Sequence, residues 1–377
     1  MTFTYPRGFA MLKTEIRKFW LILSIRIYLK YDMTPKELGF YFPAEWHNHR
    51  ATWLTFPRNI ATWEDRFERI YPAYFAFIRA ISQSERVCIN GHDEALCTWI
   101  KSQLPEYKID PNQVDIFPFP TNDSWCRDHG PAVLLHQDTQ DRMVVNWGYN
   151  AWGGKYPPFS DDDRLPLHIA DYLSLPTTTP GIIMEGGSVE FNGAGSILTS
   201  KVCLLNPNRN PHLTQADIER YLCDYYGAEQ VLWVSEGIVG DDTDGHIDDT
   251  TRFINHDTVL TATESNRLDA NYEPLKQNLS DLKSLRLPNG QALNIVELPM
   301  PDPVVDSGER LPASYANFYI TNGAVIVPTY RCRQDDVALQ IIERCFPTRD
   351  IIGIDSTEII WGLGSFHCLS QQEPIKQ

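Results

Sequence analysis

The sequence lacks the cysteine pairs that mark zinc ribbons and redox dithiols, because none of its eight cysteines stands in a C-x-x-C pattern. Scattered single cysteines are typical of reduced thiols in a cytosolic enzyme. The even count alone leaves an extracellular disulfide framework open. We therefore expect a cytoplasmic protein with free thiols.

Positive charge is also scarce. The chain of 377 residues has 33 Lys and Arg against 49 Asp and Glu, a net charge of −16. This balance disfavours nucleic acid as a partner and mildly favours cationic small molecules, although an acidic excess more often means only a solvated surface. Hydrophobic residues make up 42% of the chain, which indicates a folded soluble protein. The length allows two or three domains or one large closed architecture.

Long apolar runs are missing as well. The nearest, FWLILSIRIYL within residues 1–32, is interrupted by Arg26 and is too short to span a bilayer. It also lacks the small-residue cleavage site of a secretory signal. The segment is either an amphipathic membrane-surface helix or an over-long translation start before Met33, and we favour the second. We predict no stable membrane insertion, an N-terminal extension over 1–32 and a single domain over 33–377.

From about Phe40 onward, the chain repeats one order of elements: a helical pattern, a short apolar strand and a turn rich in Gly, Pro or Asp. The helical patterns have apolar residues at a spacing of about 3.6, and the strands are β-branched and aromatic. Pro72 and Pro166 inside two of them predict first-turn positions or kinks. The five units are EDRFERIYPAYFAFIRAIS with RVCIN, DDDRLPLHIADYLSL with TPGIIM, LTQADIERYLCDYYG with QVLWV, ANYEPLKQNLSDLKSL with ALNIVEL, and DDVALQIIERCF with DIIGI.

Further strand pairs lie between these units, in GSVEFNGAGSILTS and NFYITNGAVIVP. The second has Asn-Gly between two apolar runs, which predicts a hairpin. Repeated units that cannot bury their faces alone imply one closed assembly. We therefore expect an α/β fold built as a ring of five ββαβ-like modules, with a doubly wound open sheet as the alternative.

Similar polar residues follow four of the five strands, and a closed fold gathers such strand ends at a shared axis. Each has an ordinary interpretation: a surface ion pair for Asp128 with Arg127, a solvated turn for Glu185, a core thiol for Cys368. A calcium loop around His246 fails on spacing, although a mixed Asp/His metal site stays open. The residues are Trp125, Arg127 and Asp128 in SWCRDHGP, Glu185 in MEGGSVEF, Asp244, His246 and Asp248 in DDTDGHIDDTTRF, and Cys368 in SFHC.

Together these residues point to one chemistry. A cysteine with a histidine can perform covalent catalysis with proton transfer. Three or more carboxylates would oppose a thiolate and raise the pKa of the thiol. That excess makes sense if the substrate brings positive charge. A guanidinium is planar, permanently cationic and matched to bidentate carboxylates.

The fragments that carry this chemistry resemble the agmatine deiminase and bacterial-type peptidylarginine deiminase family, within the guanidine-modifying pentein superfamily. The resemblance covers nearly everything from Phe42 to Pro374, and the family's fold is a five-bladed α/β propeller with pseudo-five-fold symmetry. The fragments are FPAEWHNHRATWLTFP, NDSWCRDHGP, NWGYNAWGGKYPP, MEGGS, CLLNPNRNP, DTDGHIDD, ASYANFYITNG and FHCLSQQEP.

The resemblance implies a role for each site residue. Cys368 would be the nucleophile and His246 the general acid/base. Asp128 and Asp248 would bind the guanidinium, while Glu185 would position it and assist His246. Two further substrate contacts are implied, with Trp125 beside the aliphatic chain and Asn317 as a weaker candidate. The sequence departs from the family pattern at Asp249, where Asn is expected, and in the lead to the cysteine at Leu363, Ser365 and Phe366.

The implied activity is hydrolysis of a C–N bond in a linear amidine, from agmatine to N-carbamoylputrescine and ammonia, as a step of putrescine and polyamine biosynthesis. The intermediate would be a thiouronium on Cys368, with no metal and no organic cofactor. Arginine or peptidyl-arginine would need a cation for its carboxylate, for which Arg127 and Lys155 are candidates. Amidino transfer to a second amine is a further alternative on the same fold.

Two other classes stay open from the residues alone: a metal-dependent hydrolase, and an inactive polyamine-binding or structural module. Sensitivity to a chelator would mark the first. The complete Cys/His/carboxylate set disfavours the second. We expect a small cationic guanidinium substrate as partner and a homo-oligomer, with a dimer as the working expectation that the sequence does not fix.

Overall fold

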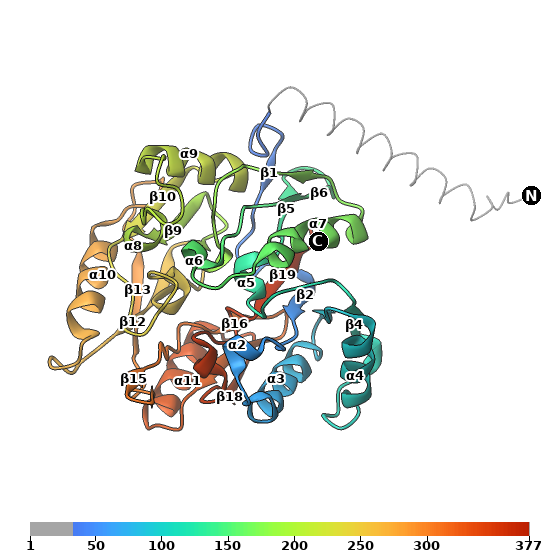
Figure 1. Cartoon of the computed structure of the whole chain (residues 1–377). Coiled ribbons are helices and arrows are strands. Elements are labelled where there is room, and N and C mark those ends of the chain that lie inside the picture. Colours follow the sequence, from blue (N-terminus) through green and yellow to red (C-terminus); the bar gives the residue numbers. More distant parts are fainter. Residues whose placement is uncertain (1–32, 377) are drawn as a thin grey trace, which may run out of the picture.

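The computed structural model of the chain describes residues 33–376 (Figure 1). The extension predicted over residues 1–32, with both of its interpretations, lies outside the described residues. Within residues 33–376, no helix combines the length and the apolar character needed to cross a bilayer.

The strands of the described part form small mixed sheets rather than one large one, so the doubly wound open sheet is wrong and the mixed α/β class is confirmed. The sheets, in strand order, are β1 (Phe40–Tyr41), β5 (Ala132–His136), β6 (Arg142–Val145) and β7 (Thr177–Thr178); β10 (Gln230–Val234), β9 (Ser196–Ser200) and β8 (Val189–Phe191); β11 (Thr251–Phe253), β12 (Thr258–Thr263) and β13 (Asn294–Pro299); β14 (Val305–Asp306) and β15 (Glu309–Arg310); β16 (Tyr319–Ile320), β17 (Ala324–Thr329) and β18 (Asp350–Asp355); β19 (Ser370–Pro374), β2 (His49–Thr55), β3 (Arg86–Asn90) and β4 (Val114–Phe117).

The longer helices lie toward the periphery of the molecule in Figure 1, and the short ones lie nearer its middle. The α-helices are α2 (Ile60–Trp63), α3 (Phe67–Ile81), α4 (Glu94–Gln103), α5 (Cys126–His129), α6 (Ala151–Gly154), α7 (Ser160–Leu173), α8 (Lys201–Leu204), α9 (Gln215–Tyr226), α10 (Tyr272–Ser284) and α11 (Gln334–Cys345). The 3₁₀ turns are η1 (Pro111–Gln113), η2 (Gly186–Ser188), η3 (Ile247–Asp249) and η4 (Ile359–Gly362).

Five of the sheets share one connection, in which an antiparallel pair is followed by a helix and a parallel strand. The pairs β5–β6, β8–β9, β11–β12 and β16–β17 continue through α7, α9, α10 and α11 to β7, β10, β13 and β18. The fifth sheet joins the two ends of the described chain, because β19 pairs antiparallel with β2, which continues through α3 to β3 (Figure 1). The ββαβ-like modules are thus confirmed as the local connection.

The hairpin predicted at Asn322–Gly323 is also confirmed, since β16 and β17 pair across it. The strand predicted in TPGIIM is wrong: β7 ends at Thr178, and from this segment only Ile183 forms a bridge, to Gly148. Pro180 has no N–H to donate, and Gly181 takes a φ of +81°, which turns the chain out of the ladder.

Pro72 and Pro166 lie inside α3 and α7, beyond the first turn, so the first-turn expectation is wrong. Each helix buries one apolar face, which in α3 includes Tyr74, Phe75 and Ile78. Packing of such a face supplies most of a helix's stability in a protein and outweighs the one hydrogen bond that a proline removes.

Candidate active site

Three short elements and the segment before β19 meet at one place: α5 contacts η2, and η2 contacts η3. Asp128 lies on α5, Glu185 caps η2, His246 caps η3, Asp248 lies within η3, and Cys368 precedes β19. All five side chains are buried. The structure therefore brings together the five residues that the sequence predicted as the reacting group, while their individual roles stay predictions.

Two of the ordinary interpretations are wrong, the surface ion pair of Arg127 with Asp128 and the solvated turn at Glu185, whereas Cys368 is indeed a buried thiol. Arg127 and Asp128 are both buried, and Arg127 does not pair with its neighbour. Its Nη2 instead donates to Glu45 Oε2 at 2.9 Å and its Nη1 to Gln372 Oε1 at 2.7 Å. Glu185 is fully buried and not a solvated turn residue.

Gly187 in the MEGGS motif leaves room for this convergence. A Cβ at Gly187 would lie 2.6 Å from His246 Nδ1 and 2.7 Å from Asp128 Oδ1, closer than any side chain permits. Its N–H donates to Asp128 Oδ1 at 2.9 Å. The motif therefore needs glycine here because two charged groups pass directly over the backbone.

Asn317 holds the cysteine. Its Nδ2 lies 3.0 Å from Cys368 Sγ, and its Oδ1 accepts from the Cys368 N–H at 3.3 Å. Burial raises the pKa of the Cys368 thiol, and the carboxyls of Asp248 and Asp249 raise it further. The resting thiol is thus protonated. Contact of Asn317 with substrate stays a prediction.

Asp249 stands where asparagine is expected. Burial raises the pKa of Asp249 well above its usual range, and the nearby charge of Asp248 adds to this effect. Asp249 Oδ1 accepts a hydrogen bond from Asn317 Nδ2 at 2.9 Å. The carboxyl at this position therefore contacts the same amide that contacts the Cys368 sulfur.

Asp128 and Asp248 have different environments. Burial raises the pKa of Asp128 to about 6; His246 opposes this effect, while the charges of Asp248 and Glu185 reinforce it. Trp152 Nε1 donates to Asp128 Oδ2 at 2.9 Å. For Asp248, burial would raise the pKa, but the hydrogen bond and charge of His367 outweigh burial and lower it. Asp248 Oδ1 is buried without a hydrogen-bond partner, which leaves it free to accept from a bound cation.

His246 lies with its Nδ1 3.6 Å from Asp128 Oδ1, and neither ring nitrogen makes a hydrogen bond of normal geometry. Burial alone would lower the pKa of His246. The carboxylate of Asp128, the hydrogen bond and charge of Cys203 and the charge of Asp248 together outweigh burial and raise that pKa well above the usual range. The ring is therefore held as an imidazolium, ready to donate a proton. Two N–H groups that donate to Asp241, those of Gly245 and His246, fix the turn that presents it.

Sequence reasoning did not predict the side chains that hold Asp248 in place, His367 and, beyond it, Glu45. His367 Nδ1 lies 2.6 Å from Asp248 Oδ2, and His367 Nε2 lies 2.8 Å from Glu45 Oε2. Both ring nitrogens of His367 therefore lie within hydrogen-bond distance of a carboxylate oxygen. Glu45 also accepts from Arg252 Nη2 at 2.9 Å. The adjacency of His367 to the cysteine was the available signal, but no sequence pattern links it to Glu45.

A cavity of about 300 Å³ opens onto Cys368. Asp128, Trp125 and Trp152 line it near the cysteine. Trp125 stacks on Trp63 with ring centroids 5.5 Å apart, close against the glycines of the GLG segment. Five acidic residues and no Lys or Arg line the rest: Glu64, Asp123, Asp242, Asp306 and Glu309.

The two cations considered as partners for a substrate carboxylate are engaged elsewhere. Arg127 binds Glu45, as described, and lies outside the residues that line this cavity. Lys155 Nζ lies 3.0 Å from Asp244 Oδ1 and 3.3 Å from Asp242 Oδ1. Neither is free to meet a carboxylate in the cavity.

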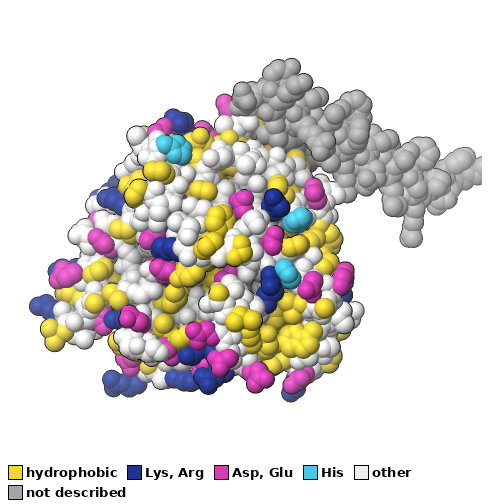
Figure 2. All heavy atoms as spheres, in the orientation of Figure 1, with side chains coloured by type: hydrophobic (Ala, Val, Ile, Leu, Met, Phe, Trp, Pro, Cys, Tyr) yellow, Lys and Arg dark blue, Asp and Glu magenta, His cyan; other side chains and the backbone are white. Residues whose placement is uncertain are grey.

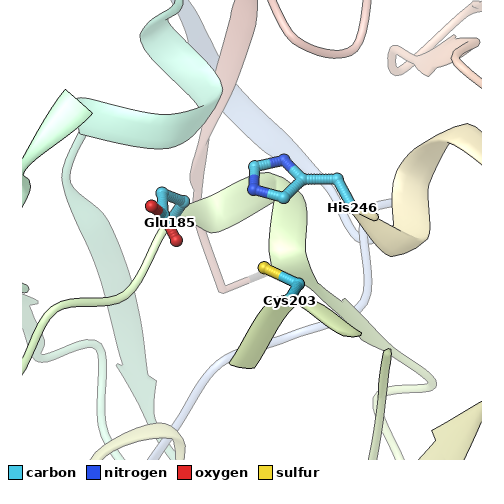
Figure 3. Close-up of side chains that lie close together, drawn as sticks. All are labelled: Glu185, Cys203 and His246. Carbon is cyan, nitrogen blue, oxygen red and sulfur yellow. The ribbon is translucent and has the colours of Figure 1, made fainter. Parts of the chain in front are cut away.

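Two clusters of side chains have ligand atoms within 4.8 Å of one another and are suited to a metal ion. One consists of Glu185, Cys203 and His246 (Figure 3), and the other of Asp248, Asp249 and Cys368. Neither includes Asp244, which accepts hydrogen bonds from Asn208, Arg209 and Lys155. Within residues 33–376, neither cluster combines an aspartate with a histidine, so neither matches the mixed Asp/His metal site left open around His246.

Comparisons with known proteins agree on one relationship. A profile of the family described as Porphyromonas-type peptidyl-arginine deiminase matches residues 41–374. A Legionella pneumophila protein provisionally named agmatine deiminase is 37% identical over 347 residues, or 91% of this chain and 97% of that protein. The solved structure of an agmatine deiminase of Enterococcus faecalis has a TM-score of 0.84 at 30% identity, covering 91% of this chain and 98% of that one. A solved Porphyromonas gingivalis protein, provisionally named arginine deiminase, has a TM-score of 0.81 at 34% identity, covering 89% of this chain and 100% of that one.

Proposed function

Because the chain belongs to the Porphyromonas-type peptidyl-arginine deiminase family, we propose that it is a hydrolase that converts agmatine to N-carbamoylputrescine and ammonia. Relatives and structural neighbours that carry the name agmatine deiminase support this assignment. The product would enter the formation of putrescine and polyamines. We place the reaction in the cytoplasm, with no metal or organic cofactor.

The observation that carries the choice of substrate is the acidic cavity. Agmatine has a guanidinium at one end and an ammonium at the other, and both suit a cavity lined by carboxylates without Lys or Arg. Free arginine or a C-terminal arginine would bring a carboxylate into the same space. Leaving that carboxylate without a cationic partner would cost binding energy.

In the proposed complex, the guanidinium lies between Asp128 and Asp248, and the unpartnered Oδ1 of Asp248 accepts one of its N–H groups. Glu185 helps to position the guanidinium. Trp125 flanks the aliphatic chain, and Asn317 contributes a contact near the sulfur. Positive charge next to Cys368 reverses the effect of the carboxylates on its pKa, so the thiol proton leaves to solvent and a thiolate forms.

The thiolate adds its electron pair to the guanidinium carbon, and the new S–C bond gives a tetrahedral adduct. His246 donates its proton to the departing nitrogen, the C–N bond breaks, and ammonia leaves a thiouronium on Cys368. His246 is now neutral and takes a proton from water, whose oxygen attacks the same carbon. The S–C bond then breaks, the sulfur leaves as a thiolate, and the remaining hydroxyl proton passes to that thiolate, which gives the neutral ureido product and restores the Cys368 thiol. Acid/base catalysis of this kind contributes about 10²–10⁴-fold in rate.

We further propose that the five sheets close into a five-bladed propeller with pseudo-five-fold symmetry and that residues 33–377 form a single catalytic domain. The recurring connection and the entry of β19 into the sheet of β2 support closure, since this pairing brings both ends of the described chain into one sheet. A homo-oligomer, most simply a dimer, remains our expectation for the assembly.

The test is to incubate the purified full-length protein with agmatine and, separately, with arginine and a C-terminal arginine peptide, and to measure ammonia and ureido product. Cys368→Ala is the inactive variant, and Cys88→Ala, a buried cysteine in β3, is the matched control. We expect wild type and Cys88→Ala to turn over agmatine and Cys368→Ala not to turn it over. A chelator should leave the rates of the two active proteins unchanged.

The alternatives predict different outcomes. Turnover of arginine or the peptide in preference to agmatine would keep the mechanism and replace the substrate, as the names of the family and of the Porphyromonas gingivalis neighbour suggest. Product that forms only when a second amine is added would indicate amidino transfer. Loss of activity with a chelator would indicate a metal-dependent hydrolase.

A further inference from the structure

A second thiol, that of Cys203, lies next to two of the predicted catalytic residues, Glu185 and His246. Cys203, on α8 after strand β9, is fully buried, and Figure 3 shows its sulfur directed toward the ring of His246. The side chain of Glu185 lies to the left of the ring in this view, next to both the ring and the sulfur (Figure 3). One ligand atom from each of the three residues lies within 4.8 Å of the other two. The proposed reaction has no use for this thiol.

Buried polar atoms of the cluster are left without full hydrogen bonding. Glu185 Oε2 has no hydrogen-bond partner and is inaccessible to solvent. The two nitrogens of the buried His246 ring lie beside Cys203 and Asp128, with Asp128 Oδ1 3.6 Å from Nδ1, but neither nitrogen makes a hydrogen bond of normal geometry. Unpaired buried polar atoms are rare, because each costs free energy, and they call for a ligand or a functional reason. Glu185 Oε1 is already satisfied by Arg209 Nε at 2.7 Å, so its open oxygen is the one available to a ligand.

The donor types select the ligand. A thiolate sulfur, an imidazole nitrogen and a carboxylate oxygen are the three donors of zinc sites, and three protein ligands leave a fourth position open for water. Calcium and magnesium prefer oxygen donors throughout. We propose that Glu185, Cys203 and His246 form a binding site for Zn²⁺ and that the bound ion inhibits the enzyme.

Inhibition follows from the residues that the ion occupies. Zn²⁺ would displace two protons to solvent, the one on the Cys203 thiol and one of the two on the His246 imidazolium, and would bind the sulfur and the nitrogen that lose them. That nitrogen could then neither donate nor accept the protons of the reaction. The charges of a thiolate and a carboxylate would balance the ion. The binding site stands on its own, while the inhibition rests on the proposed deiminase function.

Access is through the substrate cavity. Asp128 lines the cavity and lies 3.6 Å from His246, so the cluster is one side chain away from it. The competing cluster of Asp248, Asp249 and Cys368 reaches this cavity through Cys368 alone. Its Cys368 sulfur and Asp249 carboxyl already contact the amide of Asn317. In the cluster of Glu185, Cys203 and His246, by contrast, Glu185 Oε2 has no hydrogen-bond partner and can bind the ion. The experiment has to separate the two.

The test uses full-length protein freed of metal by a chelator, with Zn²⁺ itself as the probe and a chromophoric chelator as competitor. The variants are Cys203→Ala, Cys368→Ala and the control Cys88→Ala. We expect wild type, Cys368→Ala and Cys88→Ala to bind one Zn²⁺ with similar affinity. We expect Cys203→Ala to lose at least about tenfold, the lower end of the loss when even an outer partner of a metal site is removed. Glu185→Gln is nearly isosteric and should weaken Zn²⁺ binding as well. It tests the same site if Cys203→Ala fails to fold.

Deimination of agmatine supplies the second readout. Zn²⁺ should inhibit wild type and Cys88→Ala over the concentration range in which it binds, and a chelator should restore the rate. Binding that disappears in Cys368→Ala but persists in Cys203→Ala would place the ion on the nucleophile and overturn the proposal. Absence of Zn²⁺ binding to wild type would also overturn it, whether or not the protein deiminates agmatine.

Discussion

At the scale of the residue, the account depends on a thiol, Cys368, that its surroundings keep protonated and a histidine, His246, that its surroundings keep charged. Burial raises the pKa of Cys368, and the carboxylates beside it raise it further. Asp128, with Cys203 and Asp248, holds His246 as a cation against the effect of burial. The cationic substrate is therefore part of the machinery, since it alone supplies the charge that favours the thiolate.

His367 is predicted to position Asp248. In His367→Gln, Asp248 Oδ2 loses a charge-assisted hydrogen bond of 2.6 Å and its carboxylate is no longer held. Such bonds contribute about 1.5–3 kcal/mol, so kcat/KM for agmatine should fall about tenfold to a hundredfold, mainly through KM. Steady-state kinetics across pH measure this effect. A residue that served only stability would lower the melting temperature but leave the KM of the folded enzyme and its pH profile unchanged.

The pH profile should report Asp128. Its pKa of about 6 means that the carboxylate takes up a proton as the pH falls through that value. The neutral form does not attract a guanidinium, so kcat/KM should fall below about pH 6. A bound cation lowers the same pKa, so the acid limb of kcat should lie at lower pH than that of kcat/KM. A kcat/KM that stays constant down to about pH 5 would contradict this assignment.

Site residues could be predicted from the sequence only where they stand next to a recognisable strand or motif. Cys368, His246 and Asp128 each stand in a loop or turn next to a recognisable strand or motif, and a closed fold brings such positions together. Glu45 is different, because its contact with His367 spans 322 positions. Periodicity carries no information about pairs that only tertiary packing creates.

At the scale of the element, the C-terminal strand β19 links the site to the fold. It follows Cys368 closely and pairs with β2 near the other end of the described chain. The helix-strand units could be predicted because apolar spacing and β-branched runs mark them locally. Strand β7 could not be placed, because Pro180 and Gly181 override the apolar run that follows them.

Glu373 is predicted to hold β19 in place. The side chain is buried, and its carboxylate accepts from Arg142 Nη1 at 2.5 Å and from Trp53 Nε1 at 3.0 Å. Glu373→Ala leaves the partly buried guanidinium of Arg142 and the buried indole N–H of Trp53 without this partner, which should lower the free energy of unfolding by about 1–3 kcal/mol. Urea denaturation measures the change. Lys276→Ala, which removes an exposed ion pair, is the control. Equal effects of the two variants would refute a special role for Glu373.

At the scale of the whole molecule, the net charge of −16 is not spread as one acidic field. Figure 2 shows acidic and basic side chains interspersed on the face that it draws. The residues that line the cavity are the exception, because they include acidic side chains but no Lys or Arg, although Asp242 and Asp306 pair with Lys155 and Arg66 outside the lining. Attraction of the substrate is therefore a local property of the cavity.

Salt should weaken the binding of agmatine. The Debye length falls from about 10 Å at 0.1 M to about 3 Å at 1 M, which screens the ammonium from the carboxylates near the opening. The KM for agmatine should rise over this range, and that for an alkylguanidine without the distal ammonium should rise less. Equal salt dependence for both substrates would show that the acidic lining does not recognise the ammonium.

The central claim is that Cys368 forms a covalent bond to the guanidinium carbon of the substrate. The most direct measurement is intact-protein and peptide mass spectrometry after acid quenching during turnover of agmatine. The account predicts an adduct on Cys368 with the mass of agmatine less ammonia, present in wild type and absent in Cys368→Ala. Turnover without any adduct at Cys368, or an adduct on another residue in an active enzyme, would contradict it.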